Sequence, residues 1–188
     1  MTKSILFAGV GGQGILLSSK LLTAALIASG YDVKMSEVHG MAQRGGSVTT
    51  QVRFGEKVHS PIIGKGDADV LVAFEPMEAA RWLDHLKPGG RIILNTGKIP
   101  SSVILSGDKD YPEGIEEYLA EHTDLLSIDA QAMAVELGNA KAMNVILLGA
   151  LAKSLALEDV DWTALIRSEV RPAFYELNEK AFQMGFDL

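Results

Sequence analysis

The amino-acid sequence predicts an α/β fold: a three-layer Rossmann-like domain with a mainly parallel sheet and a short antiparallel excursion. Short apolar runs typical of buried strands alternate with longer stretches in which apolar residues recur at helical spacing. The first of these runs leads directly into a glycine-rich turn and a helix, as a βαβ unit begins. A length of 188 residues and a charged fraction of 22% suit one globular domain, so we expect residues 1–188 to form it.

The first βαβ unit is predicted within residues 4–37. Residues 4–9 (SILFAG) are an apolar run that ends in glycine, which predicts a buried strand. Residues 15–29 follow with apolar side chains at helical spacing, and Gly30 stands where the end of a helix favours glycine. Residues 31–37 (YDVKMSE) predict the second strand, and the crossover between the two strands should be right-handed.

The antiparallel excursion is predicted from residues 47–59. Residues 47–54 (SVTTQVRF) are rich in β-branched side chains and alternate in polarity, which predicts a half-exposed strand. Residues 55–57 (GEK) then predict a turn into a second short strand at residues 58–59. Residues 69–74 (DVLVAF) have the clearest pattern of a buried strand in the chain.

The remaining elements follow from the same patterns and from capping residues. Further strands are predicted at residues 91–95, 103–105 and 124–128. Helices are predicted at residues 76–86, 115–121, 130–137, 139–155, 162–170 and 172–184. Residues 87–90 (KPGG) predict a turn, and Asp129 and Asp161 are predicted helix N-caps. The helix at 139–155 is apolar on nearly all sides, so we expect it to be buried.

Composition excludes several classes of function. The formal net charge is −7 and the basic residues are dispersed, which argues against a nucleic-acid binder. With no cysteine the chain can supply no disulfide, no thiolate nucleophile and no cysteine-ligated iron–sulfur cluster. The four histidines lack the spacing of a metal site. No stretch reaches the roughly 18 apolar residues of a membrane span and no signal peptide is recognisable, so we expect a cytoplasmic protein without membrane contact.

The loop at residues 9–14 (GVGGQG) matches the G-x-G-x-x-G pattern between a strand and a helix. Glycines allow a tight turn and close approach of a ligand, and the first N–H groups of the helix favour an anion. A dinucleotide would also need an acidic residue near the end of the second strand, for which Glu37 is the candidate. NAD or FAD, another anionic ligand, or a purely packing role all remain open. The candidate ligand-contact residues here are Gly9, Gly11, Gly12, Gln13 and Gly14.

The second unusual stretch is the loop at residues 36–47 (SEVHGMAQRGGS), which follows the second strand. It brings together a carboxylate, an imidazole, an amide and a guanidinium between flexible glycines, and such loops are often functional. The alternatives are a ligand lip or subunit interface, and a loop held only by its own hydrogen bonds. Its candidate residues are Glu37, His39, Gln43, Arg44 and Gly45.

Signals of independent catalysis are missing from the sequence. We find no G-x-S-x-G elbow and no recognisable Ser, His and Asp arrangement, so no catalytic residue is assigned. Residues 75–78 (EPME) and 95–96 (NT) follow predicted strands, where site residues often lie, but strand ends and helix starts explain them equally well. By its motifs, the chain is not a self-sufficient enzyme.

Several segments together resemble a known family. They are GVGGQGILL at 9–17, SEVHGMAQRGGSV at 36–48, FEPMEAARWL at 74–83, LKPGG at 86–90 and AMNVILLGAL at 142–151. They resemble the smaller (beta) subunit of indolepyruvate ferredoxin oxidoreductase, which is similar to the gamma subunit or domain of pyruvate, ketoisovalerate and other 2-oxoacid:ferredoxin oxidoreductases. The resemblance covers about residues 3–184. HGMAQ at 39–43 points to the indolepyruvate branch.

The resemblance implies CoA-dependent oxidative decarboxylation of a 2-oxoacid to an acyl-CoA, carbon dioxide and reduced ferredoxin. It also implies that thiamine diphosphate and 4Fe–4S clusters belong to a larger alpha subunit, that ferredoxin is met through the complex, and that this chain is inactive alone. We expect no tightly bound cofactor on this chain. We expect the two loops to form a lip over the partner's thiamine site, with the glycine loop helping to receive the phosphates of coenzyme A. The alternatives are a stand-alone NAD-binding Rossmann oxidoreductase and a pure assembly scaffold.

Overall fold

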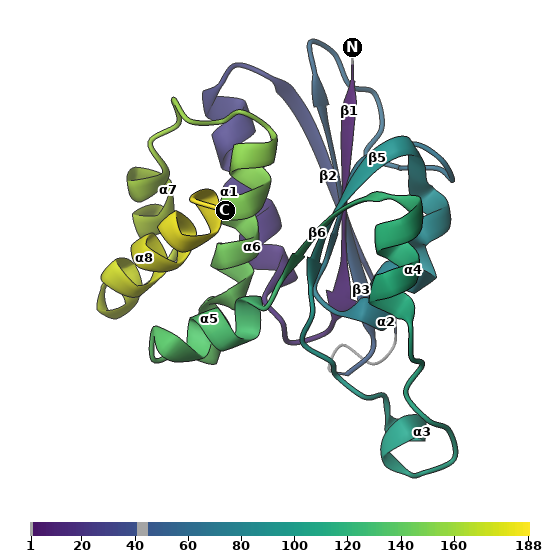
Figure 1. Cartoon of the computed structure of the whole chain (residues 1–188). Coiled ribbons are helices and arrows are strands. Elements are labelled where there is room, and N and C mark those ends of the chain that lie inside the picture. Colours follow the sequence, from purple (N-terminus) through teal and green to yellow (C-terminus); the bar gives the residue numbers. More distant parts are fainter. Residues whose placement is uncertain (1, 41–44) are drawn as a thin grey trace.

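The computed structural model describes residues 2–40 and 45–188. Its centre is a six-stranded sheet in the order β2-β3-β1-β4-β5-β6 (Figure 1). The strands are β1 (Lys3–Val10), β2 (Asp32–His39), β3 (Ser47–Gly55), β4 (Ala68–Ala73), β5 (Leu86–Asn95) and β6 (Asp124–Ile128). β1, β4, β5 and β6 are parallel, whereas β3 is antiparallel to both of its neighbours, β1 and β2. Every strand except β3 therefore runs in one direction, which confirms the mainly parallel sheet.

Helices cover both faces of this sheet. They are α1 (Ile15–Ala28), α2 (Pro76–Trp82), α3 (Ser102–Leu105), α4 (Ile115–His122), α5 (Ala130–Glu136), α6 (Met143–Ser154), α7 (Trp162–Glu169) and α8 (Tyr175–Phe186). Short 3-10 turns η1 (Leu83–His85), η2 (Ala140–Ala142) and η3 (Pro172–Phe174) precede β5, α6 and α8. Figure 1 shows α1, α6, α7 and α8 on one side of the sheet and α2 and α4 on the other. The predicted three-layer arrangement is confirmed.

Alternate side chains of β1 point to opposite faces of the sheet, so this strand contributes to two hydrophobic clusters. Ile5 and Phe7 pack with α1 and α6 in the larger hydrophobic cluster. Leu6 and Ala8 point to the opposite face, into the smaller cluster that contains residues of α2 and α4. A strand buried on both faces has no polar side, which is why residues 4–9 are an unbroken apolar run.

The position of β3 corrects one sequence prediction. We expected a half-exposed strand paired with residues 58–59, but β3 is mostly buried and pairs along its whole length with β1 and β2. Residues 58–59 form no strand, and the Val58 N–H donates instead to Asp32 Oδ2 at 2.9 Å. The βαβ unit is consequently split, because β3 lies between the parallel strands β1 and β2.

Two further local predictions differ from the structure. Residues 103–105 lie in the helix α3 rather than in a strand, on an arm that Figure 1 shows projecting from the lower end of the molecule. Residues 86–90 belong to β5, with a register shift against β4 in place of the predicted turn. The side-chain caps at Asp129 and Asp161 are confirmed, since each accepts a hydrogen bond from the N–H three residues later, at 2.9 and 3.0 Å.

The structure also confirms that the apolar helix predicted at residues 139–155 is buried. It starts as η2 and continues as α6, in which every residue from Met143 to Ala152 is buried. Its main helical neighbour is α8. Within residues 2–40 and 45–188, none of the helices has both the length and the hydropathy needed to cross a membrane.

Candidate functional site

The candidate site lies where the carboxyl ends of the parallel strands meet, at the lower edge of the sheet in Figure 1. β1 ends there in the glycine loop, β4 ends at Ala73 and β5 at Asn95. Because β3 runs in the opposite direction, its first residue, Ser47, lies at this same edge. Open α/β sheets bind ligands in the crevice outside this edge.

Main-chain hydrogen bonds join the two candidate loops. The Gly11 N–H donates to the Gly46 carbonyl at 2.8 Å, and the Gly45 N–H donates to the Gly11 carbonyl at 3.3 Å. The structure thus brings Gly11 and Gly45 together by extending the β1–β3 ladder beyond the strands. Gln43 and Arg44 lie outside the described residues, so their predicted roles stay predictions.

The side chain of Gln13 bonds the glycine loop to the last residue of β1 and to the residue after β4. Its Oε1 accepts from the Val10 N–H at 2.6 Å, and its Nε2 donates to the Phe74 carbonyl at 2.8 Å. Asn95 Nδ2 donates to the same carbonyl at 3.0 Å. The amide that the sequence offered as a ligand contact is therefore engaged within the protein.

Two glycines of the loop are required by packing. A Cβ on Gly9 would lie 2.7 Å from both Phe74 Cβ and Gln13 Oε1. Gly14 has φ +81°, and a Cβ there would lie 3.0 Å from Asn144 Cγ and still closer to Nδ2. Asn144 Nδ2 donates to the Gly14 carbonyl at 3.1 Å, so α6 presses against the start of α1.

At Gly12 the backbone conformation, and not packing, favours glycine. Its φ is +109°, in the region that L side chains rarely adopt, yet no atom lies within 4 Å of the position that a Cβ would take. Among the described residues, the N–H groups of Gly12 and Gly14 have no hydrogen-bond acceptor. These two amides, at the start of α1, are the part of the loop that remains available to an anion.

Cavities flank the glycine loop on both sides. One, of about 360 Å³, lies between the loop, Leu16, Val48 and the exposed end of β2, where Glu37 and His39 line it. The other, of about 610 Å³, lies between the loop and the segments that begin α6 and α8. The structure therefore places Glu37 and His39 beside the glycine loop, but on one side of it only.

The strand order weakens the dinucleotide interpretation of Glu37. In the doubly wound dinucleotide fold the second strand pairs directly with the first, and its acidic residue reaches the ribose. Here β3 occupies that position and displaces β2 by one strand spacing, about 4.8 Å. Glu37 lines the loop's cavity without occupying the position from which the dinucleotide motif acts.

The carboxylates of residues 75–78 are engaged in structural contacts. Glu75 is 1% exposed; its Oε2 accepts from the Glu78 N–H at 3.2 Å, and its Oε1 accepts from the Ile99 N–H at 3.3 Å and from the Tyr111 hydroxyl. Ile99 and Tyr111, which lie before and after α3 in the chain, are thereby bonded to the same carboxylate oxygen. Glu78 accepts from Arg81 Nε at 3.1 Å and from Ser47 Oγ, which fixes the start of β3.

The Tyr111–Glu75 bond predicts a loss of stability at alkaline pH. Burial, followed by the hydrogen bond to Glu75, raises the pKa of Tyr111 well above its usual range. A folded-state pKa above the unfolded value of about 10 stabilises the fold below that pH and loses this contribution as the pH rises further. Tyr111→Phe should therefore lower the urea midpoint at pH 8 and flatten its decline between pH 10 and 11. Tyr118→Phe, at an exposed position, is the control, and parallel pH curves for Tyr111→Phe and wild type would contradict the assignment.

Sequence reasoning missed the residues of the larger cavity. Its walls include Lys141 at η2, Arg171 and Phe174 at η3, and Asn144 of α6. Each stands at the start of a helix, so the only available signal was a polar or basic residue just before or within a helix's first turn. That signal does not reveal that helix starts far apart in sequence surround one cavity.

Comparison with known proteins places this fold. A family profile described as "Pyruvate ferredoxin/flavodoxin oxidoreductase" matches residues 4–188. Indolepyruvate oxidoreductase subunit IorB of Pyrococcus horikoshii is 41% identical over 190 residues, which cover 97% of this chain and 93% of that protein. The gamma subunit of the keto/oxoacid ferredoxin oxidoreductase of Geobacter sulfurreducens PCA is 25% identical, with a TM-score of 0.72 over 98% of this chain and 96% of that one.

A larger protein contains the same fold. The 2-oxoglutarate:ferredoxin oxidoreductase of Magnetococcus marinus, solved with 2-oxoglutarate, coenzyme A and succinyl-CoA bound, is 21% identical with a TM-score of 0.75. The match covers 99% of this chain and 30% of that one. The resemblance seen in the sequence is confirmed: this chain belongs to the pyruvate ferredoxin/flavodoxin oxidoreductase family, in the group of its gamma-type subunits.

Proposed function

We propose that this chain is the small subunit of an indolepyruvate-type 2-oxoacid:ferredoxin oxidoreductase. The observation that carries the proposal is the edge where Gly11 and the Gly45–Gly46 segment bond to each other, beside two open cavities. This edge belongs to a chain that is 41% identical to an indolepyruvate oxidoreductase subunit over almost its full length. In our proposal this edge is one wall of a site that another subunit completes.

The division of labour follows from the residues that this chain can offer. It has no cysteine, so it supplies no thiolate for an iron–sulfur cluster. In our proposal thiamine diphosphate and the 4Fe–4S clusters reside on a larger alpha subunit, and ferredoxin is reduced through the complex. The proposed complex is cytoplasmic and converts a 2-oxoacid, coenzyme A and oxidised ferredoxin to an acyl-CoA, carbon dioxide and reduced ferredoxin.

The part proposed for this chain is to bind coenzyme A and help close the site. The available amides of Gly12 and Gly14 and the positive end of α1 favour a phosphate group at the glycine loop. On the other side of the loop, Glu37 and His39 face the cavity next to the second loop, as expected of a lip over the partner's thiamine site. The Magnetococcus marinus protein that contains this fold was solved with coenzyme A bound.

Reconstitution tests the proposed function. Co-expressed with the larger subunit, this chain should co-purify with it, and ferredoxin reduction by an aryl pyruvate should require both chains and coenzyme A. Each chain alone should be inactive. Micromolar binding of NADH to this chain alone, measured by nicotinamide fluorescence, would instead favour the stand-alone dehydrogenase.

His39→Ala separates the lip from a pure scaffold. His39 is exposed, so its loss should leave the fold intact, while losing one polar contact in the site should reduce kcat/KM about threefold to tenfold. His59→Ala, at an exposed position near the far end of β3, is the matched control. A pure scaffold predicts that His39→Ala alters the yield of complex, while both variants keep the wild-type kinetic constants.

A further inference from the structure

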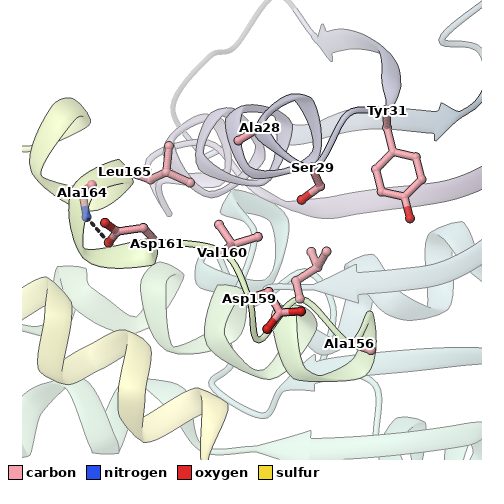
Figure 2. Close-up of a pocket in the computed structure, with 10 residues that line it drawn as sticks. Ala28, Ser29, Tyr31, Ala156, Asp159, Val160, Asp161, Ala164 and Leu165 are labelled. Carbon is pink, nitrogen blue, oxygen red and sulfur yellow. Dashed lines mark hydrogen bonds between the residues drawn. The ribbon is translucent and has the colours of Figure 1, made fainter.

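One cavity differs in the charge of its lining from four other cavities of the described residues. The protein carries a net charge of −7, and each of four described cavities is lined by at least one Asp or Glu side chain. Figure 2 shows one of these, at the far end of α1, where Asp159 and Asp161 line the wall and Asp161 accepts from the Ala164 N–H. The 610 Å³ cavity beside the glycine loop is lined by no carboxylate among the described residues. We refer to it as the basic cavity.

Two cations line the basic cavity. Lys141 lies in η2 and Arg171 immediately precedes η3, and both are exposed. Neither has an ion-pair partner among residues 2–40 and 45–188, whereas Arg167, only four residues from Arg171, is paired with Glu179 at 2.6 Å. Their charges are therefore available to a ligand, and a guanidinium can bind a phosphate through two hydrogen bonds.

Helix starts add to this positive potential. Gly14 is the N-cap residue of α1 and Arg171 is that of η3, which continues into α8, and neither helix start has a side-chain cap. The η2–α6 run begins at Asn139, whose side chain accepts only the Lys141 N–H. The cap residues of all three starts line the basic cavity, and the N-terminal ends of α1, α6 and α8 add the positive potential of their helix dipoles. Dipoles and side-chain cations thus act in the same direction at one place.

The basic cavity also has an apolar side. Phe174, which is 41% exposed, lines it together with Leu17, Val170 and Leu177. The amides of Gln131, Asn139 and Asn178 offer donors and acceptors beside this apolar surface. A volume of about 610 Å³ suits a nucleotide better than a bare phosphate ion, and an exposed aromatic face suits a purine.

We propose that the basic cavity binds the phosphorylated nucleotide end of the acyl acceptor, with Lys141 and Arg171 on the phosphates and Phe174 against the base. This inference rests on the proposed function, because within that reaction coenzyme A supplies such a group, an adenosine 3′,5′-bisphosphate. It places the phosphates on the α6–α8 side of the glycine loop, away from the carboxylate of Glu37. The Glu37–His39 cavity is then left to the reacting end.

The reconstituted complex tests the assignment. Lys141→Ala and Arg171→Ala should each raise the KM for coenzyme A about tenfold and leave kcat within about twofold, because each removes a charge-assisted contact remote from the reacting atoms. Adenosine 3′,5′-bisphosphate should inhibit the wild-type complex competitively with coenzyme A and should lose potency in both variants. Lys141→Arg should restore most of the affinity. Lys153→Ala, at the other end of α6, is the matched control.

The outcomes separate this assignment from the proposed function. If the wild-type complex is active and the double variant keeps the wild-type KM for coenzyme A, the assignment is wrong and the proposed function stands. If inorganic phosphate inhibits as strongly as the bisphosphate nucleotide, the cavity binds phosphate alone and the nucleotide assignment fails. If the complex does not reduce ferredoxin with any 2-oxoacid, the proposed function itself fails.

Discussion

Replacing Gly185 with alanine should strongly destabilise this protein. Gly185 of α8 lies against α6: an added Cβ would stand 2.7 Å from the Ile146 carbonyl carbon and closer still to its oxygen. Gly149 mirrors it on α6, where a Cβ would stand 2.8 Å from the Phe186 N. The obstacles are backbone atoms, which cannot rotate away, so we expect a loss of about 3 kcal/mol or more.

The sign of this change is diagnostic. Alanine in place of glycine within a helix normally stabilises by about 1 kcal/mol, so a steep fall in the urea midpoint can come only from the helix contact. Gly40→Ala is the control, because no atom lies within 4 Å of its added Cβ and its φ is not positive. If Gly185→Ala unfolded at the wild-type midpoint, the close α6–α8 contact would be contradicted.

The α6–α8 contact also matters for the site. Lys141 lies just before α6, and Arg171 and Phe174 just before α8, so the contact between these helices sets the distance between two walls of the basic cavity. Mild variants at this contact should consequently alter affinity for coenzyme A before they abolish folding. Gly149 and Gly185 therefore affect both the packing of the core and the shape of the basic cavity.

The sequence predicted the elements whose identity is local. β1, α1 and β4 have apolar patterns that match their burial, and the caps at Asp129 and Asp161 depend on hydrogen bonds spanning three residues. The place of β3 is not local. Its polar side chains favoured a half-exposed strand, yet its partner strands lie on both sides, and strand order follows from the packing of the whole sheet.

The candidate site was predictable only in part, for the same reason. That the two loops meet follows from the rule that ligand sites gather at the carboxyl edge of parallel strands, and Gly11 and Gly45 do meet there. The basic cavity depends instead on residues near positions 14, 141 and 171, which α6 and α8 bring together through tertiary packing. The error at residues 103–105 is of this kind too, since β-branched residues favour a strand only where a sheet edge is within reach.

Gln13 offers the sharpest test of whether the glycine loop is shaped by its own bonds or by its ligand. If the loop is shaped by its own bonds, Gln13→Ala should cost about 1–3 kcal/mol of unfolding free energy, because it leaves the Val10 N–H without its acceptor and removes a donor from the Phe74 carbonyl. Gln13→Glu should cost at least as much, since a carboxylate can still accept from Val10 but would repel the Phe74 carbonyl. Both variants should then weaken coenzyme A binding only indirectly, because the glycine loop loses its order. Unfolding by urea and the KM for coenzyme A in the complex measure the two effects separately. A Gln13→Ala protein with wild-type stability and a raised KM would show that this amide contacts the ligand directly, as the sequence pattern predicts, and that its bonds to Val10 and Phe74 give way when coenzyme A binds.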